Sequence, residues 1–196
     1  MSISTLHIFL VSLTLLISGE LQAGQSLQDL SGYRLAAFEI TGETAFPPDK
    51  LIAEFPIRAG DTFDNTRIKE GLESIRHLFE EAGYIDFTYI PSFNCDEKAK
   101  TVAVSLNLWQ GEQYYIHRIT FSGDLPESDR EIRASMSALG LVEGQIFRPS
   151  LLDRAVKSLN RMYGEERLTS KDCEFTKSAE PFARVDITFR LPKKTP

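Results

Sequence analysis

The chain has 196 residues, of which 42% are hydrophobic and 26% are charged, and its net charge is -6. This balance is ordinary for a globular protein and argues against a disordered chain. Acidic and basic residues are mixed along the chain with no basic stripe, which argues against nucleic acid or an anionic membrane surface as a partner. The 13 phenylalanines and 6 tyrosines must be buried in cores or presented to a partner.

The N-terminal segment, residues 1–23, has the pattern of a secretory signal peptide. Residues 3–17 carry no charge and are mostly apolar, and the small residue Ala23 stands at the expected cleavage site. Most signal peptides carry a Lys or Arg near the N-terminus, but none stands near Met1 in this sequence. We expect cleavage after Ala23, with an uncleaved anchor as the alternative, so that residues 24–33 form an N-terminal extension of an exported protein.

Two copies of one pattern follow, which indicates an internal duplication. Residues 35–42 alternate apolar and polar side chains and end in Gly42; residues 116–123 do the same and end in Gly123, 81 residues later. Further matches, all 84 residues apart, are Gly60 with Gly144, Phe63 with Phe147, Ile68 with Leu152, Leu72 with Val156, Ile75 with Leu159 and Phe79 with Tyr163. The pattern predicts two modules, over residues 34–111 and 112–193.

In the first copy, the strand is followed by a short helix over 47–55 and a glycine-containing turn. A longer helix then begins after Asp64 or Asn65, either of which is a suitable cap, and ends at Gly83. Its apolar face is formed by Ile68, Leu72, Ile75, Phe79 and Ala82. Two strands, over 84–93 and 101–108, are predicted to close the module around a turn at Asp96-Glu97-Lys98.

The second copy has the same plan, with a short helix over 127–139 and Ser150 as the expected cap of the longer one. Its closing strands are predicted over 168–175 and 183–191. The predicted fold class is therefore α+β: two tandem β-α-α-β-β modules, each a three-stranded mixed sheet with two helices on one face. Because residues 110–114 leave almost no linker, we also expect a stiff tandem.

No arrangement of residues predicts catalysis, a cofactor or a metal site. His77 is expected on the solvated side of the long helix and His117 at the edge of a core, and neither has the partners of a catalytic triad. Cys95 and Cys173 fall in different copies, which favours two separate thiols, although one disulfide between them stays open.

The predicted strand over residues 84–93 gives the best indication of a binding surface. Ile85, Phe87 and Tyr89 share one face, which we expect to pack under the helices. Pro91 cannot donate a ladder hydrogen bond, so this strand is predicted at the edge of the sheet. Such an edge can accept an extended peptide, or Pro91 can protect it from unwanted pairing, and both uses stay open.

These residues resemble the polypeptide-transport-associated (POTRA) domain over about 34–192. The likeness rests on residues 38–42, 57–64, 83–84 and 110–116 in combination. It is weaker in the second copy, where Arg167-Leu168 stands in place of Gly-Tyr and Gly164 falls earlier. The resemblance implies the same β-α-α-β-β fold, a periplasmic location near the outer membrane, and a role in receiving unfolded polypeptides by strand addition and in docking accessory subunits.

Carried onto this sequence, the resemblance places the peptide- or partner-binding surface on the second strand of each module. The candidate residues are Phe87, Tyr89 and Phe93 in the first module, and Cys173 and Phe175 in the second. POTRA modules usually precede a membrane β-barrel, whereas no run of amphipathic strands follows here. We therefore expect a stand-alone pair that docks onto a separate barrel or envelope complex; a fragment of a longer barrel protein is also possible.

The partners implied are extended polypeptides, an outer-membrane barrel or an envelope complex. A structural adaptor that organises envelope or division proteins without binding client peptides is the alternative function.

Overall fold

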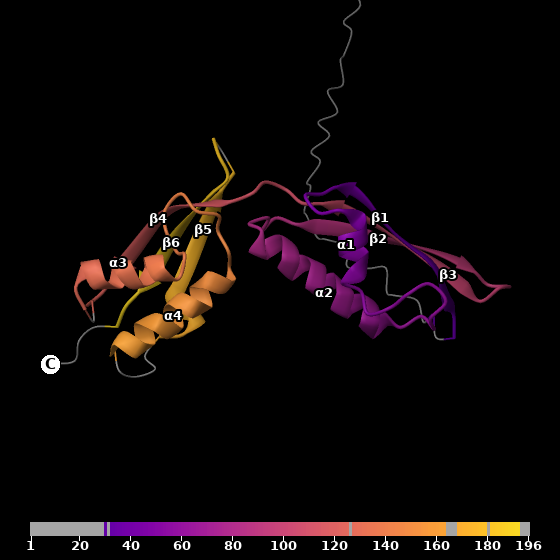
Figure 1. Cartoon of the computed structure of the whole chain (residues 1–196), viewed down its shortest axis with the longest axis horizontal. Helices are drawn as coiled ribbons and strands as arrows, with labels where there is room; N and C mark the ends of the chain where they lie inside the picture. Colours follow the sequence, from indigo (N-terminus) through magenta and orange to yellow (C-terminus); the bar gives the residue numbers. More distant parts are fainter. Residues whose placement is uncertain (1–29, 31, 126, 164–167, 180, 193–196) are drawn as a thin grey trace, which may run out of the picture.

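The computed structural model describes residues 30, 32–125, 127–163, 168–179 and 181–192. The expected signal peptide, most of the extension over 24–33, and Gly164 and Arg167 lie outside these residues. Within them the chain forms a β-α-α-β-β unit twice (Figure 1). The first unit consists of β1 (Arg34–Glu43), α1 (Pro48–Ala53), α2 (Asn65–Glu81), β2 (Thr88–Asp96) and β3 (Thr101–Trp109). The second consists of β4 (Tyr115–Ser122), α3 (Asp129–Ala138), α4 (Ser150–Tyr163), the 3-10 turn η1 (Ser170–Asp172), β5 (Cys173–Ser178) and β6 (Arg184–Arg190).

Each unit contains a three-stranded mixed sheet, in the orders β1-β3-β2 and β4-β6-β5. The central strand pairs in parallel with the first strand and antiparallel with the second. Figure 1 shows the helices of each module on one side of its sheet, and the helices of both modules on the same side of the molecule. The predicted fold class is confirmed.

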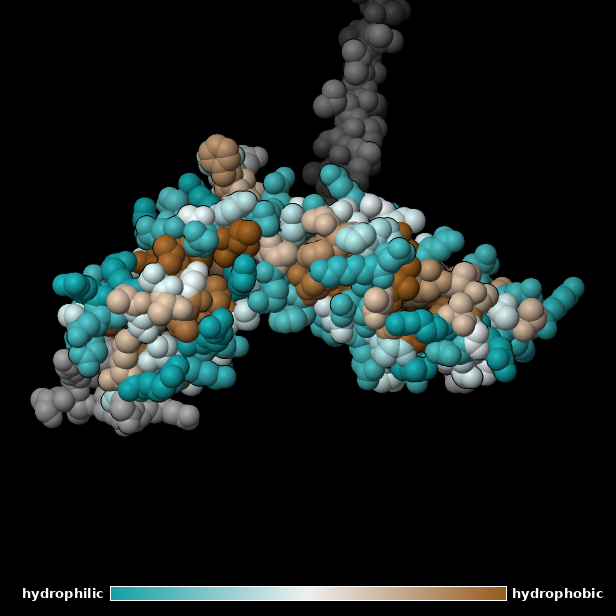
Figure 2. All heavy atoms as spheres, viewed as in Figure 1, coloured by the Kyte–Doolittle hydropathy of each residue, from teal (hydrophilic) through white to brown (hydrophobic). Residues whose placement is uncertain are grey.

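The two modules have separate hydrophobic cores. In β3, every second side chain is buried against the helices, namely Val102, Val104, Leu106 and Leu108. In β6, Val185, Ile187 and Phe189 take the same place. Figure 2 shows hydrophobic residues between sheet and helices in each module, with hydrophilic residues over much of the outer surface. One face of each sheet is therefore covered and the other is open.

The helices begin where the sequence supplies caps. The Asp64 side chain accepts from the backbone N–H groups of Thr66 and Arg67 at the start of α2, as predicted. Ser128 and Glu131 form a capping box at the start of α3. Ser150, in contrast, is the first residue of α4, and its hydroxyl donates to a Glu81 carboxylate oxygen of the first module at 2.8 Å. The sequence therefore located this helix start correctly but gave Ser150 the wrong partner.

The duplication reflects a shared backbone constraint at the end of the first strand of each module. Gly42 has a φ of +105° and Gly123 a φ of +106°. A Cβ atom at Gly42 would lie 2.1 Å from the Leu108 carbonyl oxygen, and one at Gly123 would lie 2.2 Å from that of Leu191. Only glycine fits where the first strand passes this closely to the end of the central one.

Three predictions about the strands require correction. β2 begins at Thr88, because residues 84–87 form a turn in which Phe87 N–H donates to the Tyr84 carbonyl at 3.3 Å. His117 is exposed, because a register shift between Ile116 and Arg118 turns it away from the core. Its Nδ1 lies 2.8 Å from an Asp186 carboxylate oxygen. β5, like β2, begins later than predicted, at Cys173 after η1. His77 is exposed, as predicted.

The modules are connected by a short segment that is hydrogen-bonded to the end of α2. Tyr114 N–H donates to the Gly83 carbonyl at 2.9 Å, and the Gln113 side chain donates to the Ala82 carbonyl at 2.8 Å. Ile85 packs against the core of the second module. Asp86 accepts from the Tyr114 hydroxyl at 2.7 Å and from the Lys177 ammonium. Both modules thus contribute side chains to one interface.

In the part of the chain that the structure describes, no helix has the length and apolar character needed to span a membrane.

Candidate polypeptide-docking edges

Each sheet has one edge that its own module partly covers and one that it leaves open. The turn after each short helix pairs with the beginning of the first strand, through an Arg34–Thr62 bridge in one module and a Tyr115–Ile146 bridge in the other. β2 and β5 form the opposite edges. Over residues 88–96, all described, the strand backbone hydrogen bonds go only to the central strand β3. In β5, which pairs with β6, the N–H of the first residue, Cys173, instead donates to the Ser170 carbonyl of η1. The outer side of β2 is therefore available for pairing along its length, whereas that of β5 is available only in part.

The register identifies which backbone groups of β2 point outward. The Leu106 carbonyl accepts from the Thr41 hydroxyl at 3.4 Å, so it points toward β1. Its antiparallel partner is Pro91, and this pair is consequently of the non-hydrogen-bonded kind. Since backbone direction alternates along a strand, Tyr89, Phe93 and Cys95 present their N–H and C=O groups outward, as Pro91 presents its carbonyl. Pro91 leaves one gap among the donors of this edge, as expected from its place in the sequence.

The side chains of these same residues face the helices. Tyr89 and Phe93 are half-buried, and the Phe93 ring meets the Phe63 ring edge-on at 6.2 Å. The Arg76 guanidinium of α2 lies 5.9 Å from the centre of the Tyr89 ring. These rings form the helix-facing rim of the edge.

Phe87, the third aromatic residue predicted for this surface, lies one residue before β2. It is buried with 5% exposure, and its ring stacks on Phe79 at 4.2 Å. Phe87 therefore supports the β2 edge from the core, and its side chain does not reach the surface.

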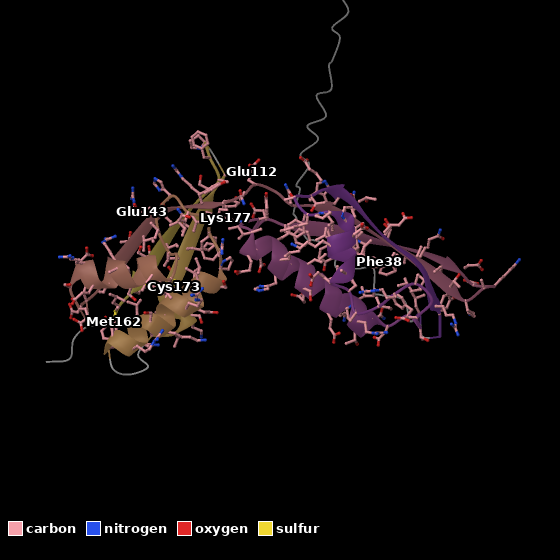
Figure 3. The ribbon with its side chains drawn as sticks, viewed as in Figure 1. Phe38, Glu112, Glu143, Met162, Cys173 and Lys177 are labelled. Atoms are coloured by element: carbon pink, nitrogen blue, oxygen red, sulfur yellow. The ribbon has the colours of Figure 1, made fainter. Side chains whose placement is uncertain are left out.

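β5 has the same backbone arrangement but is shorter. The Phe189 carbonyl accepts from the Ser122 hydroxyl at 3.3 Å and so points toward β4. The backbone groups of Phe175 and Lys177 therefore point outward, whereas the outward N–H of Cys173 donates to the Ser170 carbonyl of η1. Phe175 is 41% exposed, with its ring 4.9 Å from that of Phe147. The Lys177 ammonium pairs with Asp86 of the first module, so the end of this edge is engaged at the interface between modules (Figure 3).

The Cys173 thiol is held in its neutral form. Burial is the main cause, and together with the charges of Asp153 and Glu174 it raises the pKa of Cys173 to about 12. Cys173 and Cys95 are both half-buried free thiols in different sheets. Within the described ranges no three His, Cys, Asp or Glu side chains form a group able to hold a metal ion.

Sequence reasoning missed three residues that shape these edges. Arg76 was not assigned a role, although a basic residue on a helix that packs beside aromatic strand residues can indicate a cation–π contact. Ile90, with 58% exposure, projects from β2 to the open face of the sheet. The pairing of Lys177 with Asp86 spans 91 residues, and no local pattern could have indicated it.

Each module therefore has a helix-covered sheet with one strand edge that its own module leaves at least partly open, and this arrangement is present twice in tandem. The sequence matches the POTRA family (surface antigen variable number repeat) over residues 33–111 and 114–192. The chain therefore belongs to the POTRA family, and each of its modules matches one family unit.

Among curated proteins, the chain is similar to the outer membrane protein assembly factor BamA of Buchnera aphidicola, with 24% identity over 166 residues. The match covers 83% of this chain and 25% of BamA, so the chain spans about a quarter of that relative's length. Among solved structures, POTRA3-5 of Haemophilus influenzae BamA has a TM-score of 0.61 at 21% identity, covering 81% of this chain and 61% of that one. BamA from Haemophilus ducreyi lacking POTRA domains 1-3 has a TM-score of 0.65 at 21% identity, covering 83% and 30% respectively. Both likenesses show the same fold.

Proposed function

We propose that this chain is a periplasmic docking protein of outer-membrane protein assembly or secretion, and that the β2 edge receives an extended polypeptide as an added strand. The observation that carries the proposal is the open outer side of β2. The nine residues of this strand form strand backbone hydrogen bonds only with β3. The family membership and the similarity to an assembly factor support the biological setting.

Backbone pairing suits a protein that must accept clients of many sequences. Main-chain hydrogen bonds supply affinity without reading side chains, whereas pockets beside the strand supply selectivity. On β2 the rings of Tyr89 and Phe93 border the edge on the helix side, and Ile90 borders it on the open side. Alternate side chains of an added strand would meet aromatic groups on one face and an aliphatic group on the other, which favours apolar β-strands as clients.

β2 is a better acceptor than β5 in this proposal. β5 has six residues, and Lys177 at its end pairs with Asp86. A strand added along the whole of β5 would have to leave room for that contact or displace it. We infer that β2 is the primary edge, and that occupation of β5 is coupled to the interface between modules.

The test is a titration of isotopically labelled protein with a ten-residue peptide whose apolar and polar residues alternate as in a membrane barrel strand. We expect backbone amide shifts to concentrate in residues 88–96, with smaller changes at α2. A matched peptide N-methylated at alternate amides lacks the donors needed for pairing and should produce no saturable shifts. Equal binding of the two peptides would show that strand addition is not the mechanism.

The adaptor alternative predicts a different pattern. An adaptor would give no shifts with either peptide, yet would retain a folded protein partner from envelope extract. Recovery of neither an outer-membrane nor a secretion component in such a pull-down would contradict the proposed setting.

A further inference from the structure

The open face of the first sheet carries an exposed aromatic and acidic surface near the junction, distinct from the β2 edge. Trp109, the single tryptophan of the chain, ends β3 with 44% exposure. In the sheet register it lies between Glu43 of β1 and Thr88 of β2. Since these three residues are side by side in the sheet, their side chains lie on the same, helix-free face.

A hollow of about 500 Å³ adjoins Trp109 at the start of the inter-module segment. Its lining residues are Glu43, Tyr84, Trp109, Gln110, Gly111, Glu112 and Gln113. Two of these are aromatic and two are acidic, and none is basic. Figure 3 shows Glu112 on the segment between the modules. The hollow therefore combines ring surfaces with negative charge.

The carboxylates of Glu43 and Glu112 supply the negative charge of this hollow. Over the described residues, neither forms an ion pair or accepts a side-chain hydrogen bond. On the open face of the first sheet, the three rows of paired residues nearest the junction between the modules carry Glu39 and Glu43 and no lysine or arginine. These rows are Glu39–Ser105–Ser92, Thr41–Asn107–Ile90 and Glu43–Trp109–Thr88. The charged residues in these rows are therefore all acidic.

We propose that this surface docks a partner polypeptide by taking up one of its arginine or lysine side chains between Trp109, Tyr84, Glu43 and Glu112. Ring faces attract cations through their quadrupole, tryptophan most strongly, and two nearby carboxylates add a Coulombic attraction. Ile90, one row away and 58% exposed, supplies an apolar contact for the residue that flanks the cation. Charge complementarity thus selects a basic segment with apolar neighbours.

This surface uses side chains on the open face, whereas strand addition uses backbone atoms at the β2 edge. The two proposals therefore fail separately: an N-methylated peptide still carries its cation, and an uncharged peptide still has its backbone amides.

Trp109 reports occupation directly, because its fluorescence is the chain's only tryptophan signal. The probe is acetyl-Leu-Arg-Leu-amide, and its control is the same peptide with citrulline, which keeps the shape of arginine without its charge. The full chain should show a saturable change in Trp109 emission with the arginine peptide and none with the citrulline peptide. Equal responses would overturn the proposal.

Variants locate the site and control for net charge. Glu43→Gln and Glu112→Gln should each weaken arginine-peptide binding by roughly threefold to tenfold. Glu39→Gln removes the same charge two rows away from Trp109 and should change binding by less than about twofold. Equal effects of all three substitutions would show only a general attraction to an acidic protein and would contradict a specific site.

A dimer in sedimentation, with Trp109 emission that changes on dilution, would assign this face to a second copy of the chain and would also overturn the proposal.

Discussion

Asp86 of the first module and Lys177 of the second form an ion pair across the junction, 91 residues apart in sequence. The same carboxylate accepts from the Tyr114 hydroxyl at 2.7 Å. Burial alone would raise the pKa of Asp86, but the hydrogen bonds from Lys177 and Tyr114 and the charge of Lys177 outweigh it and hold that pKa below 3.8. One carboxylate therefore connects the turn between α2 and β2, the linking segment and the β5 edge.

Removing this charge should loosen the tandem without unfolding either module. We expect Asp86→Asn to increase the angular spread between modules in small-angle scattering, while the free energy of unfolding falls by less than about 1 kcal/mol, because the pair is partly exposed. Glu174→Gln breaks the exposed pair of Glu174 with Arg190 inside the second module and should leave the scattering profile unchanged. A profile that already requires free hinge motion in the unmodified chain would contradict the stiff tandem.

The pH dependence of this contact has a defined sign. The folded-state pKa of Asp86 is lower than its ordinary value of 3.8, so its carboxylate stabilises the junction above pH 3.8, and this contribution is lost as pH falls through the lower folded-state value. Amide shifts of residues 82–86 and 113–115 should therefore change below pH 3.8 in the unmodified chain. In the Asp86→Asn variant that step should be absent.

Gly83 should be more costly to replace than Gly60, although both have positive φ angles, of +89° and +94°. A Cβ atom at Gly60 would meet nothing within 4 Å, whereas one at Gly83 would lie 2.6 Å from the Ile146 side chain of the second module. We expect Gly60→Ala to lower the free energy of unfolding by about 1–2 kcal/mol through backbone strain, and Gly83→Ala by a further ~1–3 kcal/mol through crowding. Denaturant unfolding followed by circular dichroism measures both. Equal losses would mean that the modules are not in contact at this position.

The sequence predicted the repeated plan because each module meets the same local constraints. Gly42 and Gly123 pass the central strand too closely for any side chain, and the Asp64 cap starts a helix with a regular apolar face. Pro91 likewise required an edge position, and β2 lies at an edge. Such features are fixed by a few neighbouring residues, so a single sequence is enough to read them.

The errors arise where distant segments decide the structure. Ile85, Phe87 and Tyr89 alternate like a strand, yet Ile85 packs against the second module and the segment turns before β2 begins. His117 has the spacing of an inward-facing residue, but one bulge places it outside. The pairing of Ser150 with Glu81, like that of Lys177 with Asp86, depends on how the modules meet, which periodicity within one module does not encode.

Cys173 should react with thiol reagents far more slowly than an ordinary cysteine. Because the thiolate is the reactive form and the pKa of Cys173 is about 12, its reaction with Ellman's reagent at pH 8 should be roughly a thousandfold slower than that of free cysteine. The Cys95→Ala variant isolates this thiol. Unfolding in guanidinium removes burial and should restore the ordinary rate, and a folded-state rate within tenfold of free cysteine would contradict the buried environment.

Pro91 allows the two uses of the β2 edge to be separated. Its register places the missing N–H on the outer side of the strand, between the outward amides of Tyr89 and Phe93. Pro91→Ala should restore one donor there and tighten binding of the barrel-strand peptide by roughly threefold to tenfold, which corresponds to one added hydrogen bond. Ser92→Ala changes an adjacent residue whose backbone pairs with β3 and should leave the affinity unchanged.

If Pro91 also protects the edge, the Pro91→Ala chain without peptide should self-associate at lower concentration in light scattering. Tighter peptide binding without self-association would assign the proline to tuning client release, whereas unchanged affinity would place strand addition elsewhere than on β2.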